Sequence, residues 1–448
     1  MQKVSVIGAG VSGQGLAILA HNLGYDVLVS EMKTITPEAK SLFNENNIAY
    51  EEGHSQKVFE SDMILISSGI PPQSEILKEA EKRGVTLTGE LDFVIPHIKT
   101  HNLICVTGSN GKSTVTSLTG HVLNRAGLKA GTGGNLGTSS ARFTSENFDA
   151  VVLELSSFQL ARATKNLHAK IAVITNLAPD HIDWHGSYEA YVEAKSRVLT
   201  LRDANGYGII QDRDYDILRP SGKIITLSWD EKPGHDSEGH IFMGNDRATL
   251  TIGGETSALF KYTDTTLIGS HNLENVAMTL CAVKLLGVDV ANRAKFLLEG
   301  FRPLPHRCED AGTLGGVQYI DDSKGTNVAA TITAIKSIPG RKIIILGGQG
   351  KGEDYGALAE AVKSECDYAV LIGTEAPKIQ QALTEAGYTK FQRVKDMEEA
   401  VNVSQSLATP GMVVLLSPAC TSWDMYKSYK ARGEHFCRIV REKINSAS

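Results

Sequence analysis

The sequence lacks closely spaced cysteines. It has six cysteines in 448 residues and no CxxC pair. Small disulfide frameworks and structural zinc sites depend on such spacing, so we expect neither, and we interpret the thiols as reduced and mostly buried. These residues are Cys105, Cys281, Cys308, Cys366, Cys420 and Cys437.

The chain also lacks a long hydrophobic run and a strong excess of either charge. No apolar stretch approaches the roughly 18 residues that a membrane span requires, and MQKVSVIGAG has none of the parts of a secretion signal. Lys and Arg number 45 against 51 Asp and Glu, a net charge of −6, which disfavours a nucleic-acid coat or a polybasic membrane anchor. We therefore expect a cytoplasmic protein with no nucleic-acid partner and no stable membrane insertion. A monomer is a separate expectation that does not follow from charge or hydropathy.

Glycine is abundant, at 43 residues. Many glycines fall in turns between a short apolar run and a helical pattern, an arrangement typical of βα units and parallel sheets. The fold class predicted is α/β. At roughly 150 residues per domain the length corresponds to three domains, for which we expect residues 1–95, 96–301 and 302–448. Short alternating segments over 223–267 predict a small antiparallel part within the central domain.

The strongest chemical signal is the segment TGSNGKST at Thr107–Thr114, between a predicted strand at 103–106 and a predicted helix. Glycines let backbone N–H groups face a phosphate, a lysine reaches the β and γ phosphates, and a neighbouring hydroxyl suits Mg²⁺. The spacing departs from the general P-loop rule, because Val106 stands where the first glycine is usual. A nucleotide-phosphate site is predicted here, and a structural glycine turn is the alternative.

A second glycine loop, Gly8-x-Gly10-x-x-Gly13 followed by Glu31, matches the dinucleotide fingerprint. A dinucleotide-binding fold consists of two mononucleotide-binding halves, and the predicted first domain, residues 1–95, is long enough for only one of them. This length favours a diphosphate ligand over a nicotinamide cofactor. Structural glycines are the alternative reading.

Three other positions suggest metal or phosphate chemistry. Glu154 stands at the end of an apolar strand, where a buried carboxylate needs a cationic partner, either a metal ion or a Lys or Arg side chain. Asp180 and His181 follow another strand and are of types that occur at Mg²⁺ sites, although a solvated turn has similar composition. By composition alone, Lys195 reads as a surface lysine.

In the last third of the chain, three polar segments each follow a predicted strand. They lie at residues 321–327, 347–352 and 417–422. Because the carboxyl ends of parallel strands meet at one edge of a sheet, these lysines and hydroxyls predict a site for a small carboxylate. Taken singly, each segment could be only a helix cap.

Together these motifs resemble the Mur ligase family, ATP-dependent amide-forming enzymes of bacterial peptidoglycan synthesis with a three-domain plan. The resemblance covers essentially the whole chain. It rests on TGSNGKST (107–114), ELSSFQL (154–160), Asp180-His181, GSHNLEN (269–275), LPHR (304–307) and DSK (322–324). The GxGxxG start, ELSSFQL and LLSPAC (415–420) most resemble members that join D-glutamate to UDP-N-acetylmuramoyl-L-alanine.

The resemblance implies a Rossmann-like first domain, a central P-loop domain and a Rossmann-like last domain. It implies Lys112, His181 and Lys195 as catalytic residues, and Ser113, Glu154, His181 and Lys195 as residues at the metal. The implied metal is two Mg²⁺ ions, and Lys195 is implied to be carbamylated. Implied ATP contacts are Gly108, Asn110, Gly111, Lys112, Ser113, Thr114, Asn272, Asn275, Arg307 and Asp322. Implied UDP-substrate contacts are Val11, Ser12, Glu31, Gly69 and Asn135. Implied D-glutamate contacts are Lys324, Thr326, Lys351, Ser422 and Tyr429.

The implied reaction is phosphorylation of the alanyl carboxylate of UDP-N-acetylmuramoyl-L-alanine by ATP, followed by attack of the D-glutamate amine. Two alternatives are a ligase resembling folylpolyglutamate synthase and a P-loop ATPase that is not a ligase. Two positions depart from relatives: Gln349 stands where some have an acidic residue, and Tyr429 where an aromatic residue without a hydroxyl occurs.

Overall fold

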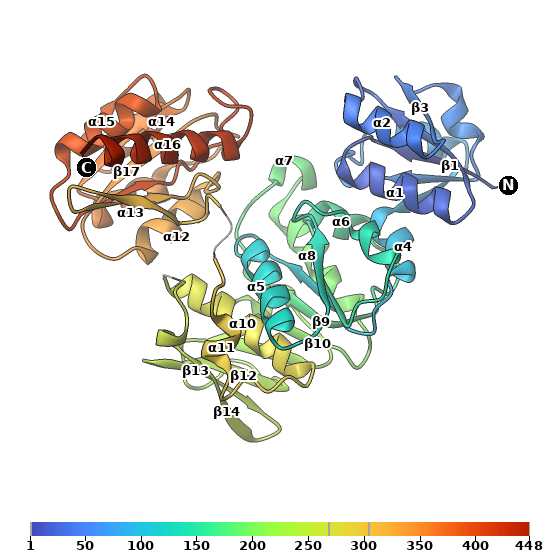
Figure 1. Cartoon of the computed structure of the whole chain (residues 1–448), viewed down its shortest axis with the longest axis horizontal. Coiled ribbons are helices and arrows are strands. Elements are labelled where there is room, and N and C mark those ends of the chain that lie inside the picture. The colour runs from blue at the N-terminus through green and yellow to red at the C-terminus, as the bar shows by residue number, and fades with distance from the viewer. Residues whose placement is uncertain (1, 268, 303–304, 448) are drawn as a thin grey trace. The chain divides into compact units, whose positions relative to one another are not determined.

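The structure, a computed structural model, describes residues 2–267, 269–302 and 305–447 and contains three β-sheets with helices between their strands (Figure 1). The chain divides into two compact units. Unit 1 comprises residues 1–266 and 274–301, and unit 2 comprises residues 267–273 and 302–448. The predicted α/β fold class is confirmed.

The first sheet of unit 1 has five parallel strands in the order β3-β2-β1-β4-β5. Its strands are β1 (Lys3–Ile7), β2 (Asp26–Glu31), β3 (Ala49–Glu52), β4 (Met63–Ile66) and β5 (Thr86–Gly89). Its helices are α1 (Val11–Asn22), α2 (Pro37–Glu45), α3 (Glu75–Lys82) and α4 (Glu90–Val94), with short 3₁₀ turns η1 (Gln56–Glu60) and η2 (Ile95–His97). The strand order reverses between β1 and β4, which is where open parallel sheets bind ligands.

The second sheet of unit 1 has nine strands in the order β14-β13-β12-β11-β10-β9-β6-β8-β7. The strands are β6 (Leu103–Thr107), β7 (Ala130–Gly134), β8 (Ala150–Glu154), β9 (Ala169–Ile174), β10 (Tyr207–Gln211), β11 (Ile224–Ser228), β12 (Gly239–Met243), β13 (Arg247–Ile252) and β14 (Glu255–Lys261). The helices are α5 (Lys112–Arg125), α6 (Ser157–Arg162), α7 (Ile182–His185), α8 (Tyr188–Thr200), α9 (Tyr215–Leu218), α10 (Ser270–Leu285) and α11 (Ala294–Leu298), with η3 (Ser140–Thr144), η4 (Asp212–Asp214) and η5 (Tyr262–Asp264).

The predicted antiparallel part is present but smaller than expected. Strands β12, β13 and β14 pair antiparallel, whereas β11 pairs parallel with β12. A parallel pair requires a crossover, and the ten residues between β11 and β12 supply it. The antiparallel part therefore begins at β12 and not at residue 223.

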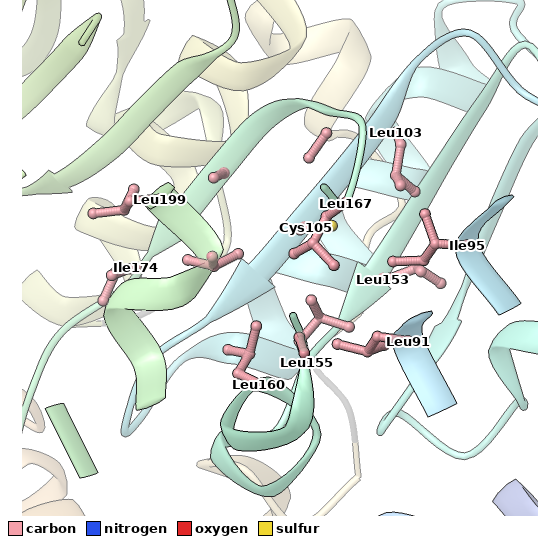
Figure 2. Close-up of a cluster of buried hydrophobic side chains, with 14 of the residues drawn as sticks. Leu91, Ile95, Leu103, Cys105, Leu153, Leu155, Leu160, Leu167, Ile174 and Leu199 are labelled. Atoms are coloured by element: carbon pink, nitrogen blue, oxygen red, sulfur yellow. The ribbon is translucent and has the colours of Figure 1, made fainter. Parts of the chain in front are cut away.

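The middle strands of this sheet are buried along their whole length. Every residue of β6 and of β8 is buried, which explains their continuous apolar runs. Figure 2 shows Leu91 and Ile95 lying in one hydrophobic cluster with Leu103 and Leu153. The segment after β5 thus packs into the core of the nine-stranded sheet, which joins the two sheets of unit 1.

The sheet of unit 2 has six strands in the order β15-β16-β20-β17-β18-β19, and only β15 is antiparallel to its neighbour. The strands are β15 (Glu309–Leu314), β16 (Val317–Asp321), β17 (Lys342–Gly347), β18 (Tyr368–Ile372), β19 (Phe391–Arg393) and β20 (Val413–Leu416). The helices are α12 (Val328–Ser337), α13 (Gly356–Glu365), α14 (Ala376–Glu385), α15 (Met397–Leu407) and α16 (Tyr429–Ala447).

The last helix begins later than the sequence predicted. The helical pattern of the last part of the sequence predicts a helix from about Asp424 to Asn445, but α16 begins at Tyr429. The Asp424 carboxylate accepts a hydrogen bond of 2.9 Å from the Thr374 amide, and the Tyr426 amide bonds to the carbonyl of Ser422 at 2.7 Å. These contacts hold residues 422–426 in a turn against the neighbouring loop.

Two further expectations can be compared with the structure. Five of the six cysteines are buried, which confirms that the thiols are mostly buried. Within the described residues, no helix has both the length and the apolar character needed to cross a bilayer.

Candidate functional site

The loop between β6 and α5 has the shape that its glycines require. Gly108 and Gly111 both have positive φ, of 142° and 81°. A Cβ at Gly108 would lie 2.0 Å from the Thr175 hydroxyl, and one at Gly111 would lie 2.5 Å from Oδ1 of Asn275. A side chain at either position would therefore clash as well as strain the backbone.

This loop is fastened to the segment that follows β9. The amides of Ser109 and Asn110 donate to the carbonyl and side-chain oxygens of Asn176, at 2.8 and 2.9 Å. The Ser109 hydroxyl lies 2.8 Å from both the Ala178 amide and the hydroxyl of Tyr191. The TGSNGKST segment and the Asp180-His181 segment, far apart in sequence, are thus one structural piece.

Two lysines meet at a single carbonyl group. Nζ of Lys112 donates to the carbonyls of Gly108 and Ser109 at 2.9 and 2.8 Å, and Nζ of Lys195 donates to the same Gly108 carbonyl at 2.7 Å. Lys195 is only 2% exposed, so the reading of it as a surface lysine is wrong. Burial, with repulsion from Lys112, holds the pKa of Lys195 well below its usual range, although Asp180 and Glu154 act in the opposite direction.

Glu154 ends β8 and is 2% exposed. Its Oε1 accepts a hydrogen bond of 2.9 Å from the side chain of Asn135, whose amide also bonds to the Glu154 carbonyl. Asn135, predicted near the sugar of the UDP substrate, is therefore brought to Glu154. A buried carboxylate, an imidazole and the hydroxyl of Ser113 are oxygen and nitrogen donors compatible with Mg²⁺.

His181 adopts a left-handed backbone conformation, with φ of 53°, directly before α7. Its ring lies 4.8 Å from that of Phe158, which also contacts Trp184 and His185. His185 in turn lies 3.0 Å from the hydroxyl of Ser157. This aromatic cluster fixes the His181 segment against the start of α6, and an unusual φ of this kind is common at functional sites.

A buried carboxylate supports the same segment from the other side. Oδ2 of Asp214 accepts a hydrogen bond of 3.1 Å from the Leu177 amide, and burial raises the pKa of Asp214 to about 6. Near it, Glu274 at the start of α10 accepts hydrogen bonds from Gln211 at 3.0 Å and from the indole of Trp229 at 2.8 Å. Glu274 is next to Asn275, so this network positions the part of α10 that packs on Gly111.

Four of the five predicted UDP-substrate residues, Val11, Ser12, Glu31 and Gly69, lie at or after the carboxyl ends of β1, β2 and β4, whereas Asn135 follows β7 in the other sheet. Oε2 of Glu31 accepts a hydrogen bond of 2.8 Å from the Ala9 amide, which ties the end of β2 to the glycine loop. The hydroxyl of Ser12 lies 3.5 Å from that of Ser68, in the loop that also carries Gly69. Val11 is 57% exposed at the start of α1.

In unit 2, the three predicted loops follow β16, β17 and β20, which are adjacent strands. The loops after β17 and β20 are joined by three backbone hydrogen bonds. The Gly347 amide donates to the Pro418 carbonyl at 2.8 Å, and Gln349 and Thr421 exchange two bonds of 2.9 Å. The loop after β20 is also joined to the loop after β16, because the Ala419 amide donates to the Gly325 carbonyl at 2.9 Å. The structure thus brings the loops of Lys324, Lys351 and Ser422 together at one edge.

Arg432, which the sequence analysis missed, joins two of these loops. It is 1% exposed, and its guanidinium donates to Ser323 Oγ at 2.9 Å and to the carbonyls of Ser323, Cys420 and Thr421 at 2.8 to 3.1 Å. Desolvation lowers the pKa of Arg432 to about 10. These four hydrogen bonds all go to the loops after β16 and β20, so Arg432 holds the two loops together.

The individual side chains of this edge differ in their environment. Nζ of Lys324 lies 5.3 Å from the ring centre of Tyr429, so these two predicted residues meet. Asp322 is buried, accepts a hydrogen bond of 2.7 Å from the Ser417 hydroxyl, and has its pKa raised to about 7, chiefly by desolvation. Ser422 is 2% exposed, whereas the Lys351 side chain is exposed. Thr326 lies two residues from Lys324, to whose carbonyl its amide bonds at 2.8 Å.

A separate carboxylate and histidine group lies beside Arg307 and Asp322. Within the described part of the chain, His306, Glu309 and Asp321 are the one group of three or more His, Cys, Asp or Glu residues whose ligand atoms lie close together. Nδ1 of His306 is 2.7 Å from Oδ2 of Asp321, and the thiol of Cys437 donates to the same oxygen at 3.3 Å. Direct hydrogen bonds account for this group without a metal.

Comparison with known proteins identifies the family. Three family models match the chain: MurD N-terminal domain over residues 3–76, Mur ligase middle domain over 106–283, and Mur ligase, glutamate ligase domain over 306–420. The chain belongs to the Mur ligase family. The matches fall on all three sheets. The glycine loop at 107–114, Glu154 and the loops after β16 and β17 lie in segments that the models cover, whereas the loop after β20 extends beyond the last matched residue, 420.

Several relatives of this Mur ligase are similar over nearly their full length. UDP-N-acetylmuramoylalanine–D-glutamate ligase of Acinetobacter baylyi is 33% identical, with 97% of each chain covered. The protein of the same name from Natranaerobius thermophilus is 35% identical, with 98% of this chain and 97% of the relative covered.

Solved structures show the same fold at much lower identity. UDP-N-acetylmuramate–alanine ligase of Thermotoga maritima has a TM-score of 0.59 at 18% identity, covering 100% of both chains. MurF ligase of T. maritima in complex with ADP has a TM-score of 0.60 at 16% identity, covering 94% of this chain and 96% of that one. At this level of identity the likeness concerns the fold alone.

Proposed function

We propose that this Mur ligase joins D-glutamate to UDP-N-acetylmuramoyl-L-alanine with hydrolysis of ATP to ADP and phosphate. An oxygen of the alanyl carboxylate attacks the γ-phosphorus and ADP leaves. The amine of D-glutamate then attacks the carbonyl carbon of the acyl phosphate, phosphate leaves, and the nitrogen loses a proton. Phosphorylation is needed because a carboxylate is a poor electrophile.

The observation that carries this proposal is the convergence of Lys112 and Lys195 on the Gly108 carbonyl, with Glu154 acting electrostatically on Lys195. A bound nucleotide would attract Lys112 to its β and γ phosphates, while the backbone amides at the start of α5 would face the anion. Catalysis of phosphoryl transfer depends mainly on such positioning and charge.

For the metal we propose Ser113, Glu154, His181 and Lys195 as the residues that hold Mg²⁺. When bound, Mg²⁺ supplies positive charge that stabilises the transferring phosphoryl group. Glu154 is positioned for this by Asn135, and His181 by the Phe158 cluster.

Lys195 fits this role only if it is modified, since an ammonium group does not ligate a cation. We propose that its Nζ carries a carbamate, formed when the nitrogen lone pair attacks the carbon of CO₂ and a proton is released. The neutral amine is the reactive form, and burial together with Lys112 favours it. Lys195→Ala is expected to reduce activity strongly, and a short carboxylic acid is expected to restore part of it.

The remaining proposed residues are substrate contacts, and we assign them to the three substrates in turn. For ATP we propose Asn272, Asn275, Arg307 and Asp322 as further contacts, and for the UDP substrate Val11, Ser12, Glu31, Gly69 and Asn135. For D-glutamate we propose Lys324, Thr326, Lys351, Ser422 and Tyr429. The domains we assign are residues 1–95 for the UDP substrate, 96–301 for ATP and 302–448 for the amino acid.

The test is phosphate release with each candidate amino acid offered alongside UDP-N-acetylmuramoyl-L-alanine and ATP. Release that requires both that nucleotide and D-glutamate is the expected result. Release without an amino acid would indicate an ATPase, and release with a folate and L-glutamate would indicate the folylpolyglutamate alternative. Either result overturns the proposal.

A further inference from the structure

A small polar cluster lies beside Glu31, at the carboxyl ends of β2 and β3. Ser30 is fully buried, and its hydroxyl donates to Oε1 of Glu51 at 2.8 Å. The same oxygen of Ser30 lies 2.8 Å from Nδ1 of His54, two residues after β3. Glu51 also accepts hydrogen bonds from the amide and the hydroxyl of Ser55, at 2.9 and 2.6 Å.

These contacts determine which nitrogen of His54 carries the proton. A hydroxyl has one proton to donate, and the Glu51 carboxylate can only accept. The proton of Ser30 therefore points to Glu51, so the Ser30 oxygen accepts from Nδ1–H of His54. In the neutral ring, Nε2 is then left as an acceptor. None of the described residues provides Nε2 with a hydrogen-bond partner.

The charge state of the ring agrees with this assignment. Burial lowers the pKa of His54, while the neighbouring carboxylates of Glu31 and Glu51 act to raise it, and the net shift is downward. His54 is thus neutral near pH 7.5, and its Nε2 accepts rather than donates.

The position of His54 follows from the order of the strands. A diphosphate at the start of α1 would lie beyond β1, and Glu31 lies at the end of β2. Adjacent strands are about 4.8 Å apart, so the end of β3 lies about 10 Å from that of β1, the reach of a nucleoside diphosphate from phosphate to base. The base would then lie near the ends of β2 and β3.

We propose that His54 selects the base of the nucleotide substrate by accepting a hydrogen bond at Nε2 from an N–H on the edge of a uracil ring. Cytosine has an acceptor at the corresponding ring nitrogen, N3, and would face Nε2 with a lone pair. This inference rests on the proposed binding of a uridine diphosphate substrate at this sheet.

The test compares the affinities of the full chain for UDP and CDP by titration calorimetry. The two nucleotides have the same phosphates and sugar, so their ratio isolates base recognition. In His54→Asn, the amide nitrogen can still donate to Ser30, but nothing occupies the place of Nε2. His54→Ala is a second variant, and His101→Phe changes an exposed histidine as the matched control.

The unmodified chain is expected to bind UDP about 10-fold more tightly than CDP, the effect of one hydrogen bond, and His54→Asn to reduce this to less than about 3-fold. The control should keep the full ratio. An unchanged ratio in both His54 variants would overturn the inference while leaving the UDP site intact. If the unmodified chain bound neither nucleotide, the proposed substrate site would be wrong as well.

Discussion

The two glycine loops of unit 1 have the same local plan, a strand, a glycine turn and a helix, but they are built for different tasks. In the loop of residues 8–13 no lysine is present, Val11 is exposed, and Glu31 occupies the Ala9 amide. In the loop of residues 108–113, Ser113 is 1% exposed and Lys112 is folded onto the loop carbonyls.

This difference matches the two tasks proposed for the loops, which are binding of a diphosphate by the first loop and transfer of a phosphoryl group at the second. A diphosphate that is only held needs backbone N–H groups and a helix start, which the first loop offers. A phosphoryl group that is transferred needs positive charge in a site shielded from water, and under the proposed function Lys112 supplies that charge at the second loop.

The largest effect is expected from Lys112→Ala. Loss of the lysine charge at the transferring phosphate should reduce phosphate release by about 10³-fold or more. UDP affinity, measured by calorimetry, should change less than about twofold, because the first loop is untouched. The exposed Lys165→Ala serves as control. An equal loss of phosphate release and of UDP affinity would indicate that the variant is misfolded, and it would contradict the proposed difference between the two loops.

An intermediate effect is expected from a pair of substitutions in the first loop. A Cβ at Gly13 would lie 1.8 Å from the Gly8 carbonyl oxygen, whereas one at Gly10 meets nothing within 4 Å, and Gly10 has φ of −71°. Gly13→Ala should lower the free energy of unfolding by about 2–4 kcal/mol and weaken UDP binding, and Gly10→Ala should cost less than about 1 kcal/mol. Denaturant titration followed by circular dichroism measures both. Equal losses would contradict close packing at Gly13.

The smallest effect is expected at Asp214, which supports the segment behind the second loop. Its pKa in the folded chain is about 6, above its usual 3.8, so the folded state prefers the protonated form. Stability should therefore fall as the pH rises from about 4 to about 6. Asp214→Asn keeps an acceptor for the Leu177 amide and should raise the free energy of unfolding at pH 7.5 by about 1–2 kcal/mol.

The gain from Asp214→Asn should disappear near pH 4, where the carboxyl group of the unsubstituted chain is protonated. Denaturant titrations at the two pH values provide the comparison. A gain of equal size at both values would mean that the substitution acts through packing instead of charge.

Local pattern was sufficient for much of the fold. The apolar runs at Met63–Ile66 and Tyr368–Ile372 predict strands with the bounds that the structure has, because a short apolar run between turn signals has few alternatives. The start of α16 was missed because Asp424 is held by Thr374, a contact between segments about 50 residues apart that a helical pattern cannot reveal.

The candidate site divides in the same way. The glycines, Lys112 and the loops after β16, β17 and β20 were recognisable because their spacing is local. Three other features depend on residues that are distant in sequence. They are the burial of Lys195, the hydrogen bond between His54 and Ser30, and the contacts by which Arg432 holds two loops. The sequence by itself determined the α/β class, the family and the glycine loops, since local geometry requires particular residues there. Only the tertiary structure decided which charges are buried and what they contact, because strand order determines which loops become neighbours.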